Sequence, residues 1–190
     1  MKIDIYKTSI YLNIYEDELN KKKYLNHLNY CKKTNNTAVV SNVGGIQTNL
    51  FLNDIDENCF FNPINEYINS FKHKSPLTWK ISNLWINENK QNCFNMPHNH
   101  IENDVHFCGI WYLKCTDKSG SLCFLNDPQN SDVCNLFKFI DDPIAFANFN
   151  INPKPNLLVL FPSRLVHLVQ PNFDDKDRIS VAFNITLSLL

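Results

Sequence analysis

A run of short segments rich in β-branched and aromatic residues fills the second half of this 190-residue chain and constrains its fold more than any other feature. Turn-forming residues separate the segments, as Asp117-Lys118-Ser119-Gly120 does between two of them. This alternation is typical of antiparallel strands. The segments predicted as strands are residues 77–87, 107–115, 121–125, 157–161, 165–169 and 179–187. Many short strands after a helical beginning favour a mainly β fold, a jelly-roll-like barrel with flanking helices packed outside.

The first third of the chain carries a different pattern. After an extended start at residues 3–12, apolar residues recur at helix-like spacing between residues 15 and 33, which predicts an amphipathic helix covering a sheet. The apolar positions of this helix are Leu19, Tyr24, Leu25, Leu28 and Cys31. Residues 41–49 hold half of the four glycines and are expected to form a loop, and a second helix is expected over residues 63–72.

The length of the chain fits a single domain with a sizeable core. We expect residues 1–75 to provide helical support and outer strands, and residues 76–190 to form the barrel core. The net charge of -1 gives the molecule no electrostatic reason to bind duplex nucleic acid or an anionic membrane. No apolar run is long enough to span a bilayer, and the first residues lack the apolar stretch of a signal peptide, so we expect a cytoplasmic protein. The seven cysteines are scattered and never spaced as CxxC, which indicates reduced thiols rather than disulfides or a zinc site.

The chain contains far fewer arginines than lysines. The chain has sixteen lysines and two arginines, Arg164 and Arg178, and both arginines lie in the same C-terminal stretch. A guanidinium group grips a carboxylate through two parallel hydrogen bonds, which the ammonium of lysine cannot do. The placement of the arginines therefore suggests a carboxylate-binding site in this stretch.

Histidines provide candidate metal ligands. His98 and His100 stand two residues apart just before a predicted strand. On an extended segment such a pair projects from one face, so both imidazoles can reach a common metal. His167 is a lone histidine in one of the most apolar stretches of the chain, where a metal bond would compensate its burial. The alternative is that His98 and His100 are surface residues of a loop and that His167 is a core histidine bonded to a carbonyl group.

Arg178 and Ser180 form a second pair spaced two residues apart, eleven residues beyond His167. A strand would aim this guanidinium and this hydroxyl to the same side, where they could hold a buried carboxylate.

Gly44-Gly45, followed by Gln47 and Asn49, either borders a substrate or simply marks a turn. The tryptophans at 79, 85 and 111 fit core or barrel-lining positions better than a base-stacking platform.

Taken together, these motifs and their order resemble the iron(II)/2-oxoglutarate oxygenases, and more narrowly a group of small 2OG-Fe(II) oxygenases of bacteria and their viruses. The resemblance spans about residues 77–185. The motifs that carry it are His98-x-His100, Gly109-Ile110-Trp111-Tyr112-Leu113, Gly120-Ser121-Leu122-Cys123-Phe124 with Asp127-Pro128, Phe161-Pro162-Ser163-x-x-x-His167, Arg178-Ile179-Ser180 and Phe183-Asn184. The resemblance implies a double-stranded β-helix, a cupin-like barrel.

The resemblance also implies residue roles. His98 and His167 would bind iron, Arg178 and Ser180 would bind the distal carboxylate of 2-oxoglutarate, and Tyr112 would hydrogen-bond this co-substrate. A glycine at position 109 would permit close backbone packing.

This sequence departs from the superfamily at the second metal ligand, which is usually a carboxylate. Here that position is His100, which gives His98, His100 and His167 as the metal set. Asp104 is the nearest carboxylate, but the chain would have to bend for it to reach inward, and His106 begins the next strand. We therefore rank His100 above both.

By resemblance, the expected activity is that of a dioxygenase that uses Fe(II), O2 and 2-oxoglutarate, with hydroxylation of a substrate C–H bond as the default outcome. Two alternatives stay open. The first is a three-histidine dioxygenase that does not need 2-oxoglutarate, and the second is a non-enzymatic jelly-roll binding module. The sequence does not name the substrate, which would be a small molecule or a protein side chain, and it leaves open a homodimer formed through exposed strands.

Overall fold

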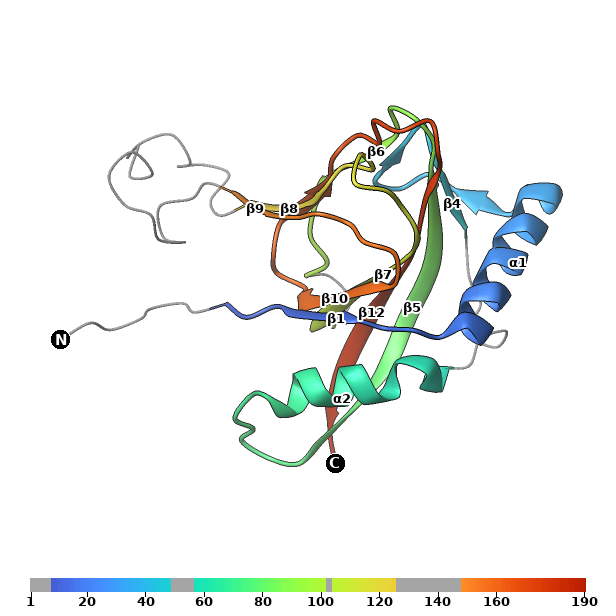
Figure 1. The fold of residues 1–190 in the computed structure, drawn as a ribbon. Coiled ribbons are helices and arrows are strands. Elements are labelled where there is room, and N and C mark those ends of the chain that lie inside the picture. Colours follow the sequence, from blue (N-terminus) through green and yellow to red (C-terminus); the bar gives the residue numbers. More distant parts are fainter. Residues whose placement is uncertain (1–7, 49–56, 102–103, 126–147) are drawn as a thin grey trace, which may run out of the picture.

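Two antiparallel β-sheets form the body of the computed structural model, which describes residues 8–48, 57–101, 104–125 and 148–190 (Figure 1). The larger sheet has the strand order β1-β10-β7-β12-β5-β4-β2 and the smaller sheet has the order β3-β6-β11-β8-β9. The strands of the larger sheet are β1 (Tyr11–Ile14), β2 (Thr37–Ala38), β4 (Ile46–Thr48), β5 (Leu77–Asn89), β7 (Phe107–Lys114), β10 (Leu157–Pro162) and β12 (Arg178–Leu189). The strands of the smaller sheet are β3 (Asn42–Val43), β6 (Phe94–His98), β8 (Leu122–Leu125), β9 (Asn148–Ile151) and β11 (His167–Val169). The fold is the mainly β jelly roll with flanking helices that the sequence predicts.

The helices cover one face of the larger sheet. Helix α1 (Glu18–Thr34) lies beside β4 and β5, and the short helix η2 (Glu57–Phe60) leads into α2 (Phe61–Asn69), which crosses β5 and β12 (Figure 1). Tyr24 and Leu28 of α1 join the buried cluster that contains Trp111 of β7. An ion pair with 2.7 Å between Lys32 Nζ and Glu88 Oε2 also ties α1 to β5. The outer face of the sheet is therefore closed by apolar packing.

Local chemistry accounts for the ends of α1. The side chain of Asp17 accepts a hydrogen bond from the backbone nitrogen of Asn20 at 3.0 Å, which satisfies a free donor at the start of the helix. The helix ends at Asn35, whose φ of 55° turns the chain out of the helix. Leu19 was predicted on the apolar stripe, but it is 68% exposed. Asn20 occupies the face shared with Tyr24, so the residue before it points elsewhere.

Strand β12 separates the apolar outer face from a polar inner face. Because side chains alternate along a strand, Val181 and Phe183 point toward the helices, whereas Arg178, Ser180 and Asn184 point between the sheets. Phe183 pairs with Gly109 of β7, and a Cβ at position 109 would collide with its ring. The close approach at Gly109 is therefore made by the side chain of Phe183, not by another backbone as the sequence led us to expect.

Strand register gathers polar side chains into one row on the inner face. Ser180 pairs with Asn87 of β5 on one side and with Tyr112 of β7 on the other. Asn87 in turn pairs with Gln47 of β4. Paired residues of antiparallel strands share a face, so these side chains all point between the sheets.

All six predicted strands are present, but several elements differ from the prediction. The segment 41–49, predicted as a loop, contains β3 and β4, which join different sheets on either side of the Gly44-Gly45 turn. Strands β6 and β9 were not predicted, because β6 contains an asparagine and a proline and β9 two asparagines. These residues have low strand propensity, which pairing with neighbouring strands overrides. The extended start lies partly outside the described residues, and β1 begins only at Tyr11. Within the described part of the chain, no helix has the length and apolar character needed to cross a membrane.

Candidate metal centre

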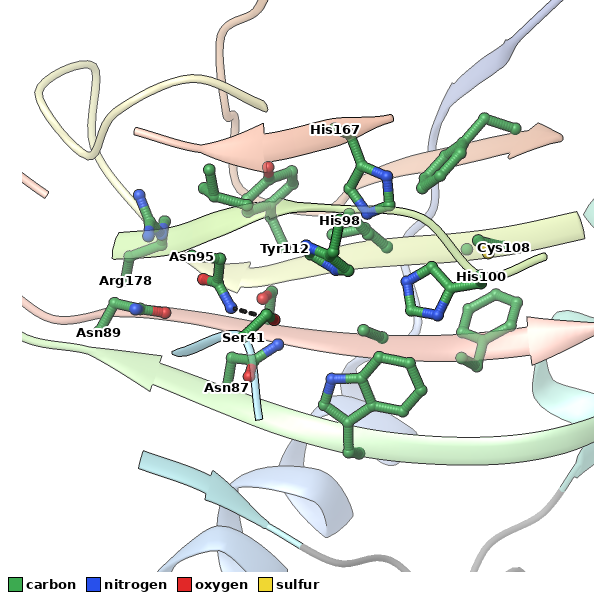
Figure 2. A pocket seen from close by; sticks show the side chains of 18 residues that line it. Ser41, Asn87, Asn89, Asn95, His98, His100, Cys108, Tyr112, His167 and Arg178 are labelled. Atoms are coloured by element: carbon green, nitrogen blue, oxygen red, sulfur yellow. Dashed lines mark hydrogen bonds between the residues drawn. The ribbon is translucent and has the colours of Figure 1, made fainter. Parts of the chain in front are cut away.

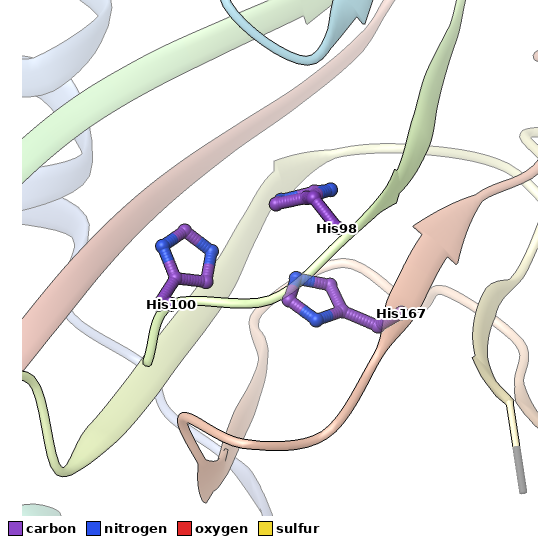
Figure 3. Close-up of side chains that lie close together, drawn as sticks. All are labelled: His98, His100 and His167. Carbon is purple, nitrogen blue, oxygen red and sulfur yellow. The ribbon is translucent and has the colours of Figure 1, made fainter. Parts of the chain in front are cut away.

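Three histidine side chains converge between the two sheets (Figure 3). His98 ends β6 and His167 begins β11, and the two residues are direct partners in the smaller sheet. His100 follows β6, and its backbone nitrogen donates to Ser163 O at 3.0 Å, which holds this stretch beside the end of β10. One nitrogen atom of each ring lies within 4.8 Å of the other two. The chain thus brings together all three predicted metal ligands.

Hydrogen bonds orient two of these rings. His98 Nδ1 lies 2.7 Å from Met96 O, and His167 Nδ1 lies 2.9 Å from Leu165 O. Because a carbonyl oxygen only accepts, each Nδ1 carries a proton, and each Nε2 is left with a lone pair for a metal.

Burial keeps the three imidazoles neutral. It lowers the pKa of His167 to about 3 and that of His100 to about 4, and it also lowers the pKa of His98. Neutral imidazoles are the form that binds metals, so the cluster is ready for a cation at neutral pH.

Arg178 lies at the far end of the same cavity and is 1% exposed (Figure 2). Its Nη1 donates to the carbonyl oxygens of Ser119 and Gln170, the latter at 2.9 Å, which fixes the guanidinium. Its Nη2 is buried and has no hydrogen-bond partner among the residues that the structure describes. Neither of the two ion pairs in the described part of the chain involves Arg178. Burial lowers the pKa of Arg178, yet a guanidinium stays charged, so this cation is fit to receive an anion.

Tyr112 and Ser180 line the cavity near Arg178. The hydroxyl of Tyr112 is buried and has no hydrogen-bond partner within the described ranges of the chain. Burial raises the pKa of Tyr112 to about 12, so the phenol is a donor at neutral pH. An unpartnered guanidinium nitrogen and an unpartnered phenol, facing one cavity with three neutral imidazoles, fit a metal-bound dicarboxylate such as 2-oxoglutarate.

The other candidate residues named from the sequence lie outside the cavity. Asp104 is exposed with a φ of 59° and is not part of the histidine cluster. His106 is exposed, and its Nδ1 accepts a hydrogen bond from Leu187 N at 3.1 Å. Arg164 is also exposed, and its Nη2 donates to Thr8 Oγ1 at 2.7 Å, so only one of the two arginines reaches the cavity. Asn49 and Asp127-Pro128 lie outside the described residues.

Three asparagines that sequence reasoning missed also line the cavity: Asn87, Asn89 and Asn95. Asn87 and Asn89 continue the row that begins with Trp85, because every second residue of β5 faces inward. The spacing of two between Trp85, Asn87 and Asn89 was the signal that could have revealed the two asparagines of β5. Trp85 lines the cavity with its ring 5.9 Å from that of His100, whereas Trp111 is fully buried in the core.

Comparison with known proteins agrees with this geometry. The profile of a family described as "Putative 2OG-Fe(II) oxygenase" matches residues 83–184, more than half of the chain. No curated protein sequence matches significantly.

Among solved structures, a viral collagen prolyl hydroxylase from Paramecium bursaria Chlorella virus-1 is 14% identical with a TM-score of 0.59, covering 93% of this chain and 94% of that one. A Pseudomonas putida prolyl-4-hydroxylase is 13% identical with a TM-score of 0.59, covering 94% and 93%. HygX from Streptomyces hygroscopicus is 11% identical with a TM-score of 0.62, covering 94% and 83%. At these identities the structural matches show the fold, which is the double-stranded β-helix.

The family match covers both ends of the cavity, from β5 to β12. It favours the oxygenase over the non-enzymatic binding module that the sequence alone left open. The chain belongs to the 2OG-Fe(II) oxygenase family, and it is a dioxygenase that uses iron(II), 2-oxoglutarate and O2.

Proposed function

We propose that His98, His100 and His167 hold the iron of this dioxygenase. Their neutral rings lie together, and the Nδ1 hydrogen bonds of His98 and His167 leave the Nε2 of each ring free for a metal. In this assignment His100 takes the place of the carboxylate that usually completes the facial triad. A set of three neutral ligands leaves the full charge of the metal uncompensated by the protein, so the site favours an anionic co-ligand.

Arg178 is proposed to bind the distal carboxylate of 2-oxoglutarate, with Ser180 and Tyr112 as further donors. The observation that carries this proposal is the buried Nη2 of Arg178, which has no partner and lies in the cavity that the histidines line. The carbonyl groups of Ser119 and Gln170 hold the guanidinium in place before the ligand arrives. When bound, iron and 2-oxoglutarate supply the oxidation of a substrate C–H bond by O2, with succinate and CO2 as the other products.

The same observation argues against a three-histidine dioxygenase that works without 2-oxoglutarate. Such an enzyme has no need of a buried cation at the end of its cavity. Burying an unpaired charge destabilises a protein unless a ligand compensates it. Arg178 is 1% exposed and has no ion pair in the described part of the chain, which fits an anion-binding role.

Anaerobic titration of Fe(II) and 2-oxoglutarate into the apo-protein tests both assignments, because the complex has a visible metal-to-ligand charge-transfer band. We expect the band in the wild-type protein, and we expect His100→Ala to lose it while Asp104→Ala and His106→Ala keep it. Loss of the band in Asp104→Ala with retention in His100→Ala would transfer the second ligand to Asp104. Absence of the band in the folded wild-type protein would contradict the whole site assignment.

The finer expectations about substrate, assembly and location also belong to this proposal. The similar structures include two prolyl hydroxylases and an enzyme with hygromycin B bound. We propose that this chain likewise oxidises a protein side chain or a small molecule. Five of the described cysteines are free thiols, which supports a reducing, cytoplasmic location; they are Cys31, Cys93, Cys108, Cys115 and Cys123. A single domain with its barrel core in residues 76–190 and a homodimer through exposed strands stay predictions, the latter for sedimentation analysis.

A further inference from the structure

A second hollow opens beside the metal centre. We call it the outer chamber, and it is lined by Gln47, Asn83, Trp85 and Asn184 together with His98 and His100. It measures about 780 Å³ when the space open to solvent is counted. Since the two histidines line both hollows, the outer chamber gives a second molecule access to the metal centre.

The outer chamber lies away from Arg178. Arg178 and Tyr112 line only the first cavity, whereas Asn184 lines only the outer chamber. Asn184 stands six residues further along β12, roughly 20 Å at the rise of a strand. Because the co-substrate is assigned to the Arg178 end, the outer chamber is left for the substrate whose C–H bond is oxidised.

Two nearly buried carboxamide side chains in the outer chamber have hydrogen-bonding groups that no described residue uses. Gln47 is 8% exposed, and its side chain has no hydrogen bond to any residue that the structure describes. Asn184 is 5% exposed, and its Oδ1 accepts a weak hydrogen bond from Cys108 Sγ at 3.5 Å, while its Nδ2 has no such bond. The polar atoms of these two side chains are not fully buried but face the open chamber, where a bound molecule can form hydrogen bonds with them.

The residues that line the outer chamber indicate the chemical class of its ligand. Among the described residues that line the outer chamber there is no aspartate, glutamate, lysine or arginine. A charged substrate group would lose its hydration there without gaining a counter-ion. A carboxamide presents a donor and an acceptor in one plane, which is the pattern that another amide group matches. The indole of Trp85 adds a flat apolar surface that an amide plane can lie against.

We propose that the outer chamber binds an uncharged amide group of the substrate, and that Gln47 and Asn184 determine this specificity. The proposal rests on the proposed function, since it places the reacting C–H bond beside the metal centre. Such an amide group is present in a peptide bond and also in a small carboxamide. The proposal excludes substrates that must place a carboxylate or an ammonium group in the chamber.

The test uses protein loaded with 2-oxoglutarate and zinc, which is diamagnetic and does not turn over. Binding is followed through the side-chain ¹H–¹⁵N amide signals of Gln47 and Asn184. The probes are N-acetylglycine N-methylamide, acetamide, acetate, methylammonium and methyl glucoside. We expect the first two probes to shift both signals and the other three to leave them in place. Tighter binding of N-acetylglycine N-methylamide would identify a peptide as the source of the amide, and equal binding of acetamide would identify a small carboxamide.

Variants make the test specific to the chamber. Gln47→Leu should weaken binding of the amide probe about threefold to tenfold, as expected for one lost hydrogen bond. Gln91→Leu is the matched control, because Gln91 is exposed in a turn. Gln47→Glu is nearly isosteric and should shift the preference toward methylammonium, which keeps the proposal testable if Gln47→Leu folds poorly.

Equal binding of acetate or methyl glucoside, or unchanged amide affinity in both Gln47 variants, would overturn the proposal. The charge-transfer band with iron separates this outcome from a failure of the proposed function. A charge-transfer band in the wild-type protein without amide binding would contradict only the inference about the outer chamber. Amide binding without the band would instead contradict the assignment of the metal centre.

Discussion

Replacing Arg178 by lysine keeps the positive charge of the cavity but removes the planar guanidinium group. One nitrogen of this group bonds to backbone carbonyl groups and the other is left for a ligand. Nη1 of Arg178 donates to the carbonyl oxygens of Ser119 and Gln170, while Nη2 is free for a ligand. A lysine ammonium is a single point that cannot serve the carbonyl groups and a carboxylate with the same geometry. One charge-assisted hydrogen bond to 2-oxoglutarate should therefore be lost.

The expected loss follows from the strength of such bonds. A hydrogen bond to a charged group contributes about 1.5–3 kcal/mol, and each 1.4 kcal/mol is about tenfold in affinity. We thus expect the Kd for 2-oxoglutarate to rise about tenfold to a hundredfold in Arg178→Lys, while iron binding alone changes little. The Kd is measured by anaerobic titration of the charge-transfer band.

Arg164→Lys is the matched control, because the only other arginine of the chain is exposed and bonds to Thr8. Its Kd should equal that of the wild-type protein. Circular dichroism and the Tm establish that Arg178→Lys is folded. A Kd within twofold of the wild-type value in a folded Arg178→Lys protein would refute the argument, because the charge alone would then suffice.

Three further predictions follow from individual contacts. His167→Ala should abolish iron binding, since it removes a buried ligand that pairs directly with His98, and stoichiometric iron in the purified variant would contradict this role. Tyr112→Phe should act in two opposite directions: removal of an unpartnered buried hydroxyl should stabilise the ligand-free protein by about 1–3 kcal/mol, whereas 2-oxoglutarate should bind more weakly. The Tm without ligand and the Kd test the two halves separately, and a lower Tm would show that the hydroxyl is satisfied. Gly109→Ala should destabilise the fold by about 1–3 kcal/mol because its Cβ meets the Phe183 ring, and an unchanged midpoint of urea unfolding would show that the ring moves aside at no cost.

Much of the fold could be predicted because the alternation of side chains along a strand is a local property. Strand β12 shows this directly, since Val181 and Phe183 are apolar and face the helices while Arg178 and Ser180 face the cavity. The same period made the spacing of His98 and His100 informative. Strands β6 and β9 escaped prediction because polar residues such as Asn95 form strands only through partners far along the chain.

The sequence predicted the site only as certain residue types at certain spacings along the chain. The tertiary structure decided which of these residues lie close together. Two arginines and one carboxylate, Asp104, were candidates in the sequence. Burial distinguishes Arg178 from Arg164, and Asp104 lies outside the histidine cluster. The polar row that joins Gln47 and Asn87 to Ser180 depends on the register of three strands, and no local pattern encodes that register.

The sequence by itself determined the mainly β class, the inward-facing residues of its long strands and the chemical types that a metal centre needs. Only the tertiary structure decided that three histidines share one centre and that Arg178 lacks a partner, and it alone separated an outer chamber from the first cavity. The physical reason is that side-chain alternation depends on neighbours along the chain, whereas burial, convergence and unmet hydrogen bonds depend on residues brought together by packing.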